Sequence, residues 1–91
     1  MAENMSLNFP NASRSYDPDG RRIRFWGYDN ALEVPFFVEE EALFRLDPKA
    51  RNTESSMLAT FDAALDRIRS VAGRMYSSSR RRFYVLVAAD F

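Results

Sequence analysis

The sequence predicts an α+β domain with a small, mostly antiparallel sheet in the order β-β-β-α-α-β. Turn residues and alternating apolar residues fill the first half of the chain, a helical stripe follows, and one more strand pattern ends it. We expect one long and one short helix packed on one face of this sheet. The length of 91 residues suits a single domain over residues 1–91, with a flexible N-terminus at residues 1–4.

The first strand is expected near the N-terminus. Apolar and polar residues alternate from Met5 to Phe9, and Pro10 follows, which predicts a strand interrupted at the proline. The segment 17–20, Asp-Pro-Asp-Gly, predicts a tight turn, since Asp bonds its own backbone, Pro fixes φ and Gly tolerates left-handed geometry. The first strand should therefore pair antiparallel with a strand that begins at Arg21.

The stretch 21–41 predicts a β-hairpin that leads directly into a helix. With residues 29–30 as the loop, Phe25 lies opposite Val34 and apolar residues pair with one another on one face. This inner face consists of Ile23, Phe25, Gly27, Leu32, Val34 and Phe36. A slip of one residue would mix apolar and polar positions, so the two faces are well defined. Pro35 has no N–H to donate, so we expect an edge or a bulge there.

Two helices are expected after the hairpin. The acidic triplet 39–41 opens a short one, because carboxylates interact favourably with the N–H groups of a first turn, and 47–48, Asp-Pro, ends it. Asn52 or Thr53 caps a long helix that runs to about Tyr76 with one broad apolar stripe. We interpret the triplet as a helix start and not as a cation site, since no further oxygen ligands can be placed.

The last segment, 83–91, reads FYVLVAADF and is apolar on both of its alternating faces. Such a strand is typically buried on both sides. One long and one short helix can cover only one face of a small sheet, so the second face needs another cover. A second copy of the chain and the chain's own N-terminal segment are the two candidates, and an exposed ligand-binding face is the third possibility. We predict the second copy, and therefore a homodimer.

Four stretches of the chain carry a family resemblance: FPN, SYD, RFWGYDNALEVPFFVEEEAL and YVLVAADF. In these stretches the chain resembles the DUF1488 family of small proteobacterial proteins of unknown function, from about Leu7 to Phe91. The resemblance implies an α+β fold with a compact antiparallel sheet and helices on one face. It implies no activity, and no catalytic residue can be carried over.

The composition bears on several classes of function. The absence of Cys and His excludes disulfides and thiolate or imidazole metal sites, and it removes the commonest general base at neutral pH. We therefore expect no enzyme, no cofactor and no metal. A formal net charge of zero argues against binding nucleic acid or membranes non-specifically. The sequence contains no signal-peptide pattern and no membrane-length apolar run, so a soluble cytoplasmic protein is expected.

The best candidate for a functional surface is the second sheet face, because aromatic and arginine side chains are enriched in the cores of protein interfaces. The expected members are Arg22, Arg24, Trp26, Tyr28, Phe37, Tyr84 and Leu86. We predict a small accessory or regulatory protein that acts through protein–protein interaction. The alternative is a nucleic-acid-associated regulator in which the arginine clusters at 21–24 and at Arg80, Arg81 and Arg82 contact anions.

Overall fold

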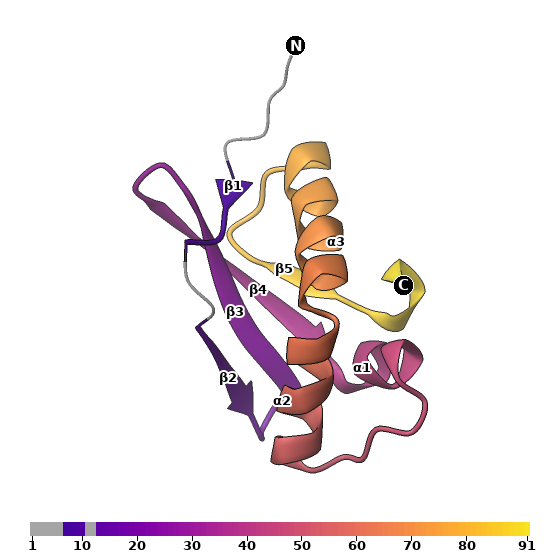
Figure 1. Ribbon diagram of the computed structural model, residues 1–91. Coiled ribbons are helices and arrows are strands. Elements are labelled where there is room, and N and C mark those ends of the chain that lie inside the picture. The colour runs from indigo at the N-terminus through magenta and orange to yellow at the C-terminus, as the bar shows by residue number, and fades with distance from the viewer. Residues whose placement is uncertain (1–6, 11–12) are drawn as a thin grey trace.

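The computed structural model describes residues 7–10 and 13–91, and it confirms the α+β class. The three α-helices pack on one face of the sheet (Figure 1). The elements are β1 (Leu7–Asn8), β2 (Arg14–Asp17), β3 (Arg22–Asp29), β4 (Leu32–Glu39), α1 (Glu40–Leu46), α2 (Glu54–Ala63), α3 (Leu65–Ser78), β5 (Tyr84–Leu86) and the 3-10 helix η1 (Ala88–Asp90). The expected flexible terminus at residues 1–4 and the start of the first strand at Met5 lie outside the described residues.

The sheet is mixed and not mostly antiparallel. Its order is β1-β3-β4-β5, and β2 also pairs with β3. β1 pairs with the end of β3 and β2 with its start, so the two form one interrupted antiparallel edge, as the proline predicted. β5 pairs parallel with β4, because the three helices between them return the chain to the end of the sheet where β4 begins.

The hairpin register differs from the expected one by two residues. The loop is formed by residues 30–31, so Phe25 lies opposite Phe36 and not opposite Val34. A slip of two residues keeps every side chain on its face, so the assignment of faces is confirmed while the pairing is wrong. The observed register stacks the rings of Phe25 and Phe36, whose centroids are 5.2 Å apart. It also places Asn30, which tolerates a left-handed backbone, at φ 57° in the loop.

The long helix expected up to Tyr76 is two helices, α2 and α3, which meet at Ala64. The Ala64 N–H donates to the carbonyl oxygens of Thr60 and Phe61, at 3.1 and 3.2 Å, so the turn tightens there. Neither Gly nor Pro marks this break in the local sequence. It allows α2 to pack against β2 and β3 while α3 packs against β5.

The short helix and the helix caps agree with the sequence. α1 begins after Glu39 and ends at Leu46, and its C-cap Asp47 lies directly before Pro48. The Thr53 hydroxyl accepts a hydrogen bond from the Ser56 N–H at 3.3 Å and caps α2. Local chemistry therefore sets both helix starts.

The terminal strand is shorter than its apolar pattern suggested. β5 covers only three residues, and the chain then turns into η1, where the Asp90 carboxylate accepts a hydrogen bond from the Val87 N–H at 2.8 Å. β5 starts to pair with β4 at Phe36. Pro35 therefore lies where β4 has a strand neighbour on one side only, as its missing N–H predicted.

The core is organised around a row of aromatic rings that crosses the sheet. Phe36 stacks on Phe25 on one side and on Tyr84 on the other, with centroids 5.2 Å apart in each pair. Phe61 of α2 and Tyr76 of α3 close over this row at 5.2 Å from Phe25 and 5.9 Å from Tyr84. The helices thus bury the inner face of the sheet.

We expect Phe36→Ala to lower the free energy of unfolding by about 3–5 kcal/mol, because it removes the central ring of the row and leaves a cavity. Chemical denaturation measures the loss. The matched control is Leu32→Ala on the same strand, where the exposed side chain should contribute within about 0.5 kcal/mol. Equal effects of the two substitutions would contradict this account of the core.

Candidate interaction surface

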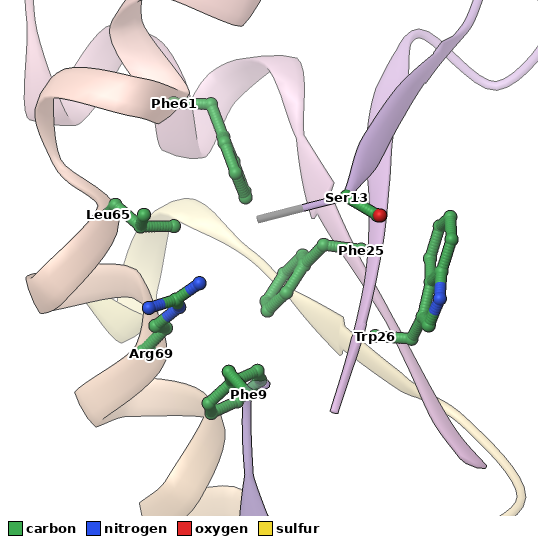
Figure 2. Close-up of a pocket in the computed structure, with 7 residues that line it drawn as sticks. All are labelled: Phe9, Ser13, Phe25, Trp26, Phe61, Leu65 and Arg69. Carbon is green, nitrogen blue, oxygen red and sulfur yellow. The ribbon is translucent and has the colours of Figure 1, made fainter. Parts of the chain in front are cut away.

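The outer face of the sheet is the face on which no described helix packs. Alternation along β3 sends Phe25 toward the helices and Trp26 to the opposite side, as Figure 2 shows. The same alternation on β4 and β5 places Phe37 and Val85 beside each other on the outer side. We call the following residues the outer sheet face: Arg22, Arg24, Trp26, Tyr28, Glu33, Pro35, Phe37, Glu39, Phe83 and Val85.

The outer sheet face carries several ring side chains. Trp26 lies opposite Pro35, and Phe37 meets Phe83 edge to face with centroids 6.0 Å apart. Phe83 is 50% exposed. Trp26, Pro35 and Phe37 are half-buried. A partly exposed strip of this composition is typical of a surface that another molecule covers.

Two guanidinium groups lie over this strip. The Arg22 guanidinium is 4.0 Å from the centroid of the Phe37 ring. The Arg24 guanidinium is 5.2 Å from the centroid of the Trp26 ring. Arg22 is also held by Asp17 at 3.3 Å. Cation–π contacts of this kind hold the arginine side chains flat against the rings. The strip is therefore ordered in the single chain before any partner binds.

The structure brings together five of the seven residues predicted for this surface, namely Arg22, Arg24, Trp26, Tyr28 and Phe37. Tyr84 and Leu86 were assigned wrongly, since they are 1% and 0% exposed and lie in the core. Their positions follow from the parallel register, which pairs Tyr84 with the inward residue Phe36. The outward side chains of this segment are Phe83 and Val85, which the sequence did not single out.

The chain's own N-terminal segment, as far as the structure describes it, does not cover this face. Residues 7–8 form the edge strand β1, and Phe9 points to the helix side. There the Phe9 ring lies 6.1 Å from the rings of both Phe25 and Phe36. Among the described residues, the outer sheet face therefore has no cover from within the chain.

The two arginine clusters lie at opposite ends of the hairpin. Arg21 and Arg22 are at the start of β3, whereas Arg80 contacts Asp29 at its end, at 3.6 Å. Arg80, Arg81 and Arg82 border a cavity next to Leu32, at the start of β4. The clusters consequently do not form one continuous basic surface, which the nucleic-acid alternative would need.

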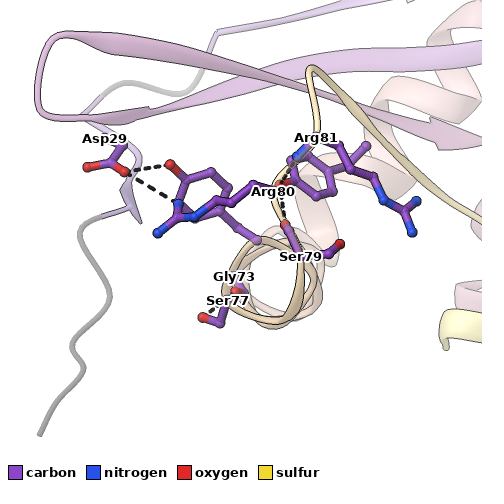
Figure 3. A network of polar contacts seen from close by, with 8 residues as sticks. Asp29, Gly73, Ser77, Ser79, Arg80 and Arg81 are labelled. Atoms are coloured by element: carbon purple, nitrogen blue, oxygen red, sulfur yellow. Dashed lines mark hydrogen bonds and ion pairs between the residues drawn. The ribbon is translucent and has the colours of Figure 1, made fainter.

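A polar network at the hairpin end was missed in the sequence. The Tyr76 hydroxyl donates to the Asp29 carboxylate at 2.5 Å, and the Arg80 guanidinium lies 4.4 Å from the centroid of the Tyr76 ring (Figure 3). The hydrogen bond to Asp29 and the burial of the ring raise the pKa of Tyr76. A tyrosine in the apolar stripe of a helix indicates that its hydroxyl has a buried hydrogen-bond partner. The sequence alone did not identify Asp29 as that partner.

Neighbouring hydrogen bonds fix the loop that carries the arginines. The Tyr84 hydroxyl donates to the carbonyl oxygen of Ser79 at 2.6 Å and accepts from the Arg81 N–H at 3.0 Å. Tyr84 is a core residue, so the loop backbone is tied to the core at two points.

Two further properties concern cofactors and membranes. No group of three or more acidic side chains in the described part of the chain could hold a metal ion. Within the same residues, no helix combines the length and the apolar character that a membrane crossing requires.

We expect Asp29→Asn to lower the pKa of Tyr76 toward the ordinary tyrosine value of about 10, because the charged acceptor is lost. Absorbance of tyrosinate across alkaline pH measures the midpoint, and Tyr76→Phe identifies which transition belongs to this residue. Glu33→Gln, which alters the partner of a different tyrosine, serves as the control.

The sign of the pH effect on stability follows from the raised pKa of Tyr76. The stabilisation that the protonated Tyr76 hydroxyl provides is fully present below the pKa of this tyrosine in the unfolded chain, which is about 10. It is lost as the pH rises through the higher pKa of Tyr76 in the folded protein. If the titration midpoint of Tyr76 were the same in Asp29→Asn as in the wild type, the Asp29 carboxylate would not be the cause of the raised pKa.

Comparison with known proteins identifies the family. A search of curated proteins and a search of solved structures found no match. A family model described as a protein of unknown function, DUF1488, matches residues 7–87. The matched region includes every strand of the sheet and all three α-helices. The chain therefore belongs to the DUF1488 family, as its sequence motifs indicated.

Proposed function

We propose that this protein is a non-enzymatic accessory or regulatory module that forms a homodimer through its outer sheet face. The observation that carries the proposal is the strip of Trp26, Pro35, Phe37 and Phe83 on the side of the sheet away from the helices. Phe83 is exposed and the other three are half-buried. Burial of such a strip between two chains removes apolar area from water at roughly 25 cal/mol per Å². Its tryptophan and arginines are the types that most often dominate the binding energy of interfaces.

A second copy of the chain is the partner that fits this face best. The face carries charges of both signs, with Arg24 and Glu33 on opposite sides of the Trp26–Pro35 pair. A two-fold axis that runs across the strands through this pair brings Arg24 of one copy toward Glu33 of the partner subunit, and the reverse contact forms at the same time. The net charge of zero adds no overall repulsion between copies.

A binding role has more support than catalysis. The chain has no His or Cys to serve as a general base or nucleophile at neutral pH. The junction between the edge strand and the helices, lined by Phe9, Phe25, Phe61 and Arg69, has no space for a water molecule and therefore cannot admit a substrate (Figure 2). We place the module in the cytoplasm, as the sequence led us to expect.

The central test is Trp26→Glu, which places a charge in the middle of the apolar strip. We expect the wild type to be a dimer at micromolar concentration and the variant to dissociate about tenfold or more readily. Light scattering coupled to size exclusion gives the mass at each concentration. Leu32→Glu is the matched control, because Leu32 is 63% exposed and points to the other face of the sheet. A monomeric wild type, or equal masses for the wild type and Trp26→Glu, would refute the proposal.

The same residue supplies an independent readout, because Trp26 is the sole tryptophan. Dilution of the wild type should shift its fluorescence to longer wavelength as the ring becomes hydrated. The Leu32→Glu control should show the same shift over the same concentration range. A wavelength that does not change over the range in which the mass halves would place the interface elsewhere.

A further inference from the structure

We propose that the arginine loop 79–82 and the cavity beside it bind an acidic peptide segment of a partner protein, through its carboxylates and one apolar side chain. This site lies at the end of the hairpin, on the helix side of the sheet. It shares Glu33 with the outer sheet face, while its other lining residues lie outside that face, and it does not rest on the dimer proposed above.

The cavity supplies a pocket for the apolar side chain. It has a volume of about 380 Å³ and opens between the start of β4 and the loop that follows α3. Leu32, Val34 and Tyr76 supply its apolar lining, and the side chains of Arg80, Arg81 and Arg82 border it. Leu32 is the most exposed large apolar residue of the described chain. Space of this size accommodates one or two side chains of a bound peptide.

The backbone of the arginine loop is already in place. Both the Ser79 carbonyl and the Arg81 N–H are hydrogen-bonded to the buried Tyr84 hydroxyl. Arg80 is held by Asp29 and lies over the Tyr76 ring. Figure 3 shows these contacts joining the hairpin end, the end of α3 and the loop. A partner that binds here does not have to order the loop first, which lowers the entropic cost of binding.

The charge of the site selects an acidic partner. No ion pair engages Arg81 or Arg82 in the part of the chain that the structure describes, whereas Arg80 is paired. The one carboxylate residue that lines the cavity, Glu33, accepts a hydrogen bond from the Tyr28 hydroxyl at 3.5 Å on the outer sheet face. Two guanidinium groups are therefore available to bind carboxylates with paired N–H donors.

A peptide fits these features better than a nucleic acid does. Single-stranded nucleic acids bind to exposed aromatic faces on which bases stack. The tyrosine ring in the cavity is only 5% exposed, and the remaining apolar lining is aliphatic. An aliphatic pocket beside Arg81 and Arg82 suits a leucine- or isoleucine-like side chain flanked by Asp or Glu.

The test selects from a display library of short random peptides on the full-length protein. The variant Arg81→Glu/Arg82→Glu is compared with the wild type and with Arg21→Glu/Arg51→Glu, which makes the same charge change at two exposed arginines outside the site. We expect the wild type to enrich acidic peptides that contain a large aliphatic residue. The double variant at 81 and 82 should weaken the binding of an enriched peptide about tenfold or more, and Leu32→Ser by a smaller factor.

The controls separate this site from the dimer interface. Arg21→Glu/Arg51→Glu and Trp26→Glu should leave peptide affinity unchanged, as measured by fluorescence anisotropy. The proposal is overturned if no peptide is enriched, if the enriched peptides lack acidic residues, or if the double variant binds them equally well. It is also overturned if a single-stranded oligonucleotide displaces the peptides and binds Leu32→Ser as tightly as the wild type. That result would show that the loop recognises phosphate groups.

Discussion

Aromatic stacking across β3, β4 and β5 is the interaction on which the rest of the structure depends. Phe36 lies in the middle of this row, between Phe25 and Tyr84. Ring pairs of this kind contribute about 0.5–1.5 kcal/mol beyond the area that they bury. The row sets the hairpin register and fixes β5 beside β4 with Tyr84 inward. It also supplies the surface against which Phe61 of α2 and Tyr76 of α3 pack.

The row also determines the outer sheet face. Successive side chains of a strand point to opposite sides, so each inward ring forces its neighbours outward. Because the Phe36 side chain points inward, those of Pro35 and Phe37 point outward. Because the Phe25 side chain points inward, that of Trp26 points outward. The crossover from β4 to β5 carries all three α-helices, and they pack on the inward side. The partly exposed aromatic strip is thus a consequence of how the core is built, and a second chain is the cover we propose for it.

Sequence patterns predicted those parts of the fold that short-range chemistry decides. The faces of the hairpin, the interruption at Pro10 and the caps at Thr53 and Asp47 all follow from alternation, missing donors or side-chain bonds to the backbone. The register was missed because a slip of two residues leaves the face pattern unchanged, while the observed pairing stacks Phe25 on Phe36.

Long-range pairing explains the remaining errors. β5 is apolar on both sides, so its sequence does not reveal which side faces the core, and Tyr84 and Leu86 were placed on the wrong face. The break at Ala64 lets α2 and α3 pack on different strands, and neither Gly nor Pro marks it in the local sequence. The hydrogen bond from Tyr76 to Asp29 joins residues 47 positions apart in the chain. Patterns of apolar spacing within a helix or strand do not predict such a contact. The candidate surface was therefore predictable on the hairpin and unpredictable on the terminal strand.

The most direct test of the central claim uses nuclear Overhauser effects between chains, measured in a mixture of isotope-labelled and unlabelled protein. We predict contacts between chains that connect the ring of Trp26 in one copy with the side chain of Pro35 in the other, since the proposed two-fold axis runs through this pair. Their appearance would place the outer sheet faces of two copies against each other. Contacts between chains that involve only helix residues, or none at concentrations where Trp26 is shielded from water, would contradict it.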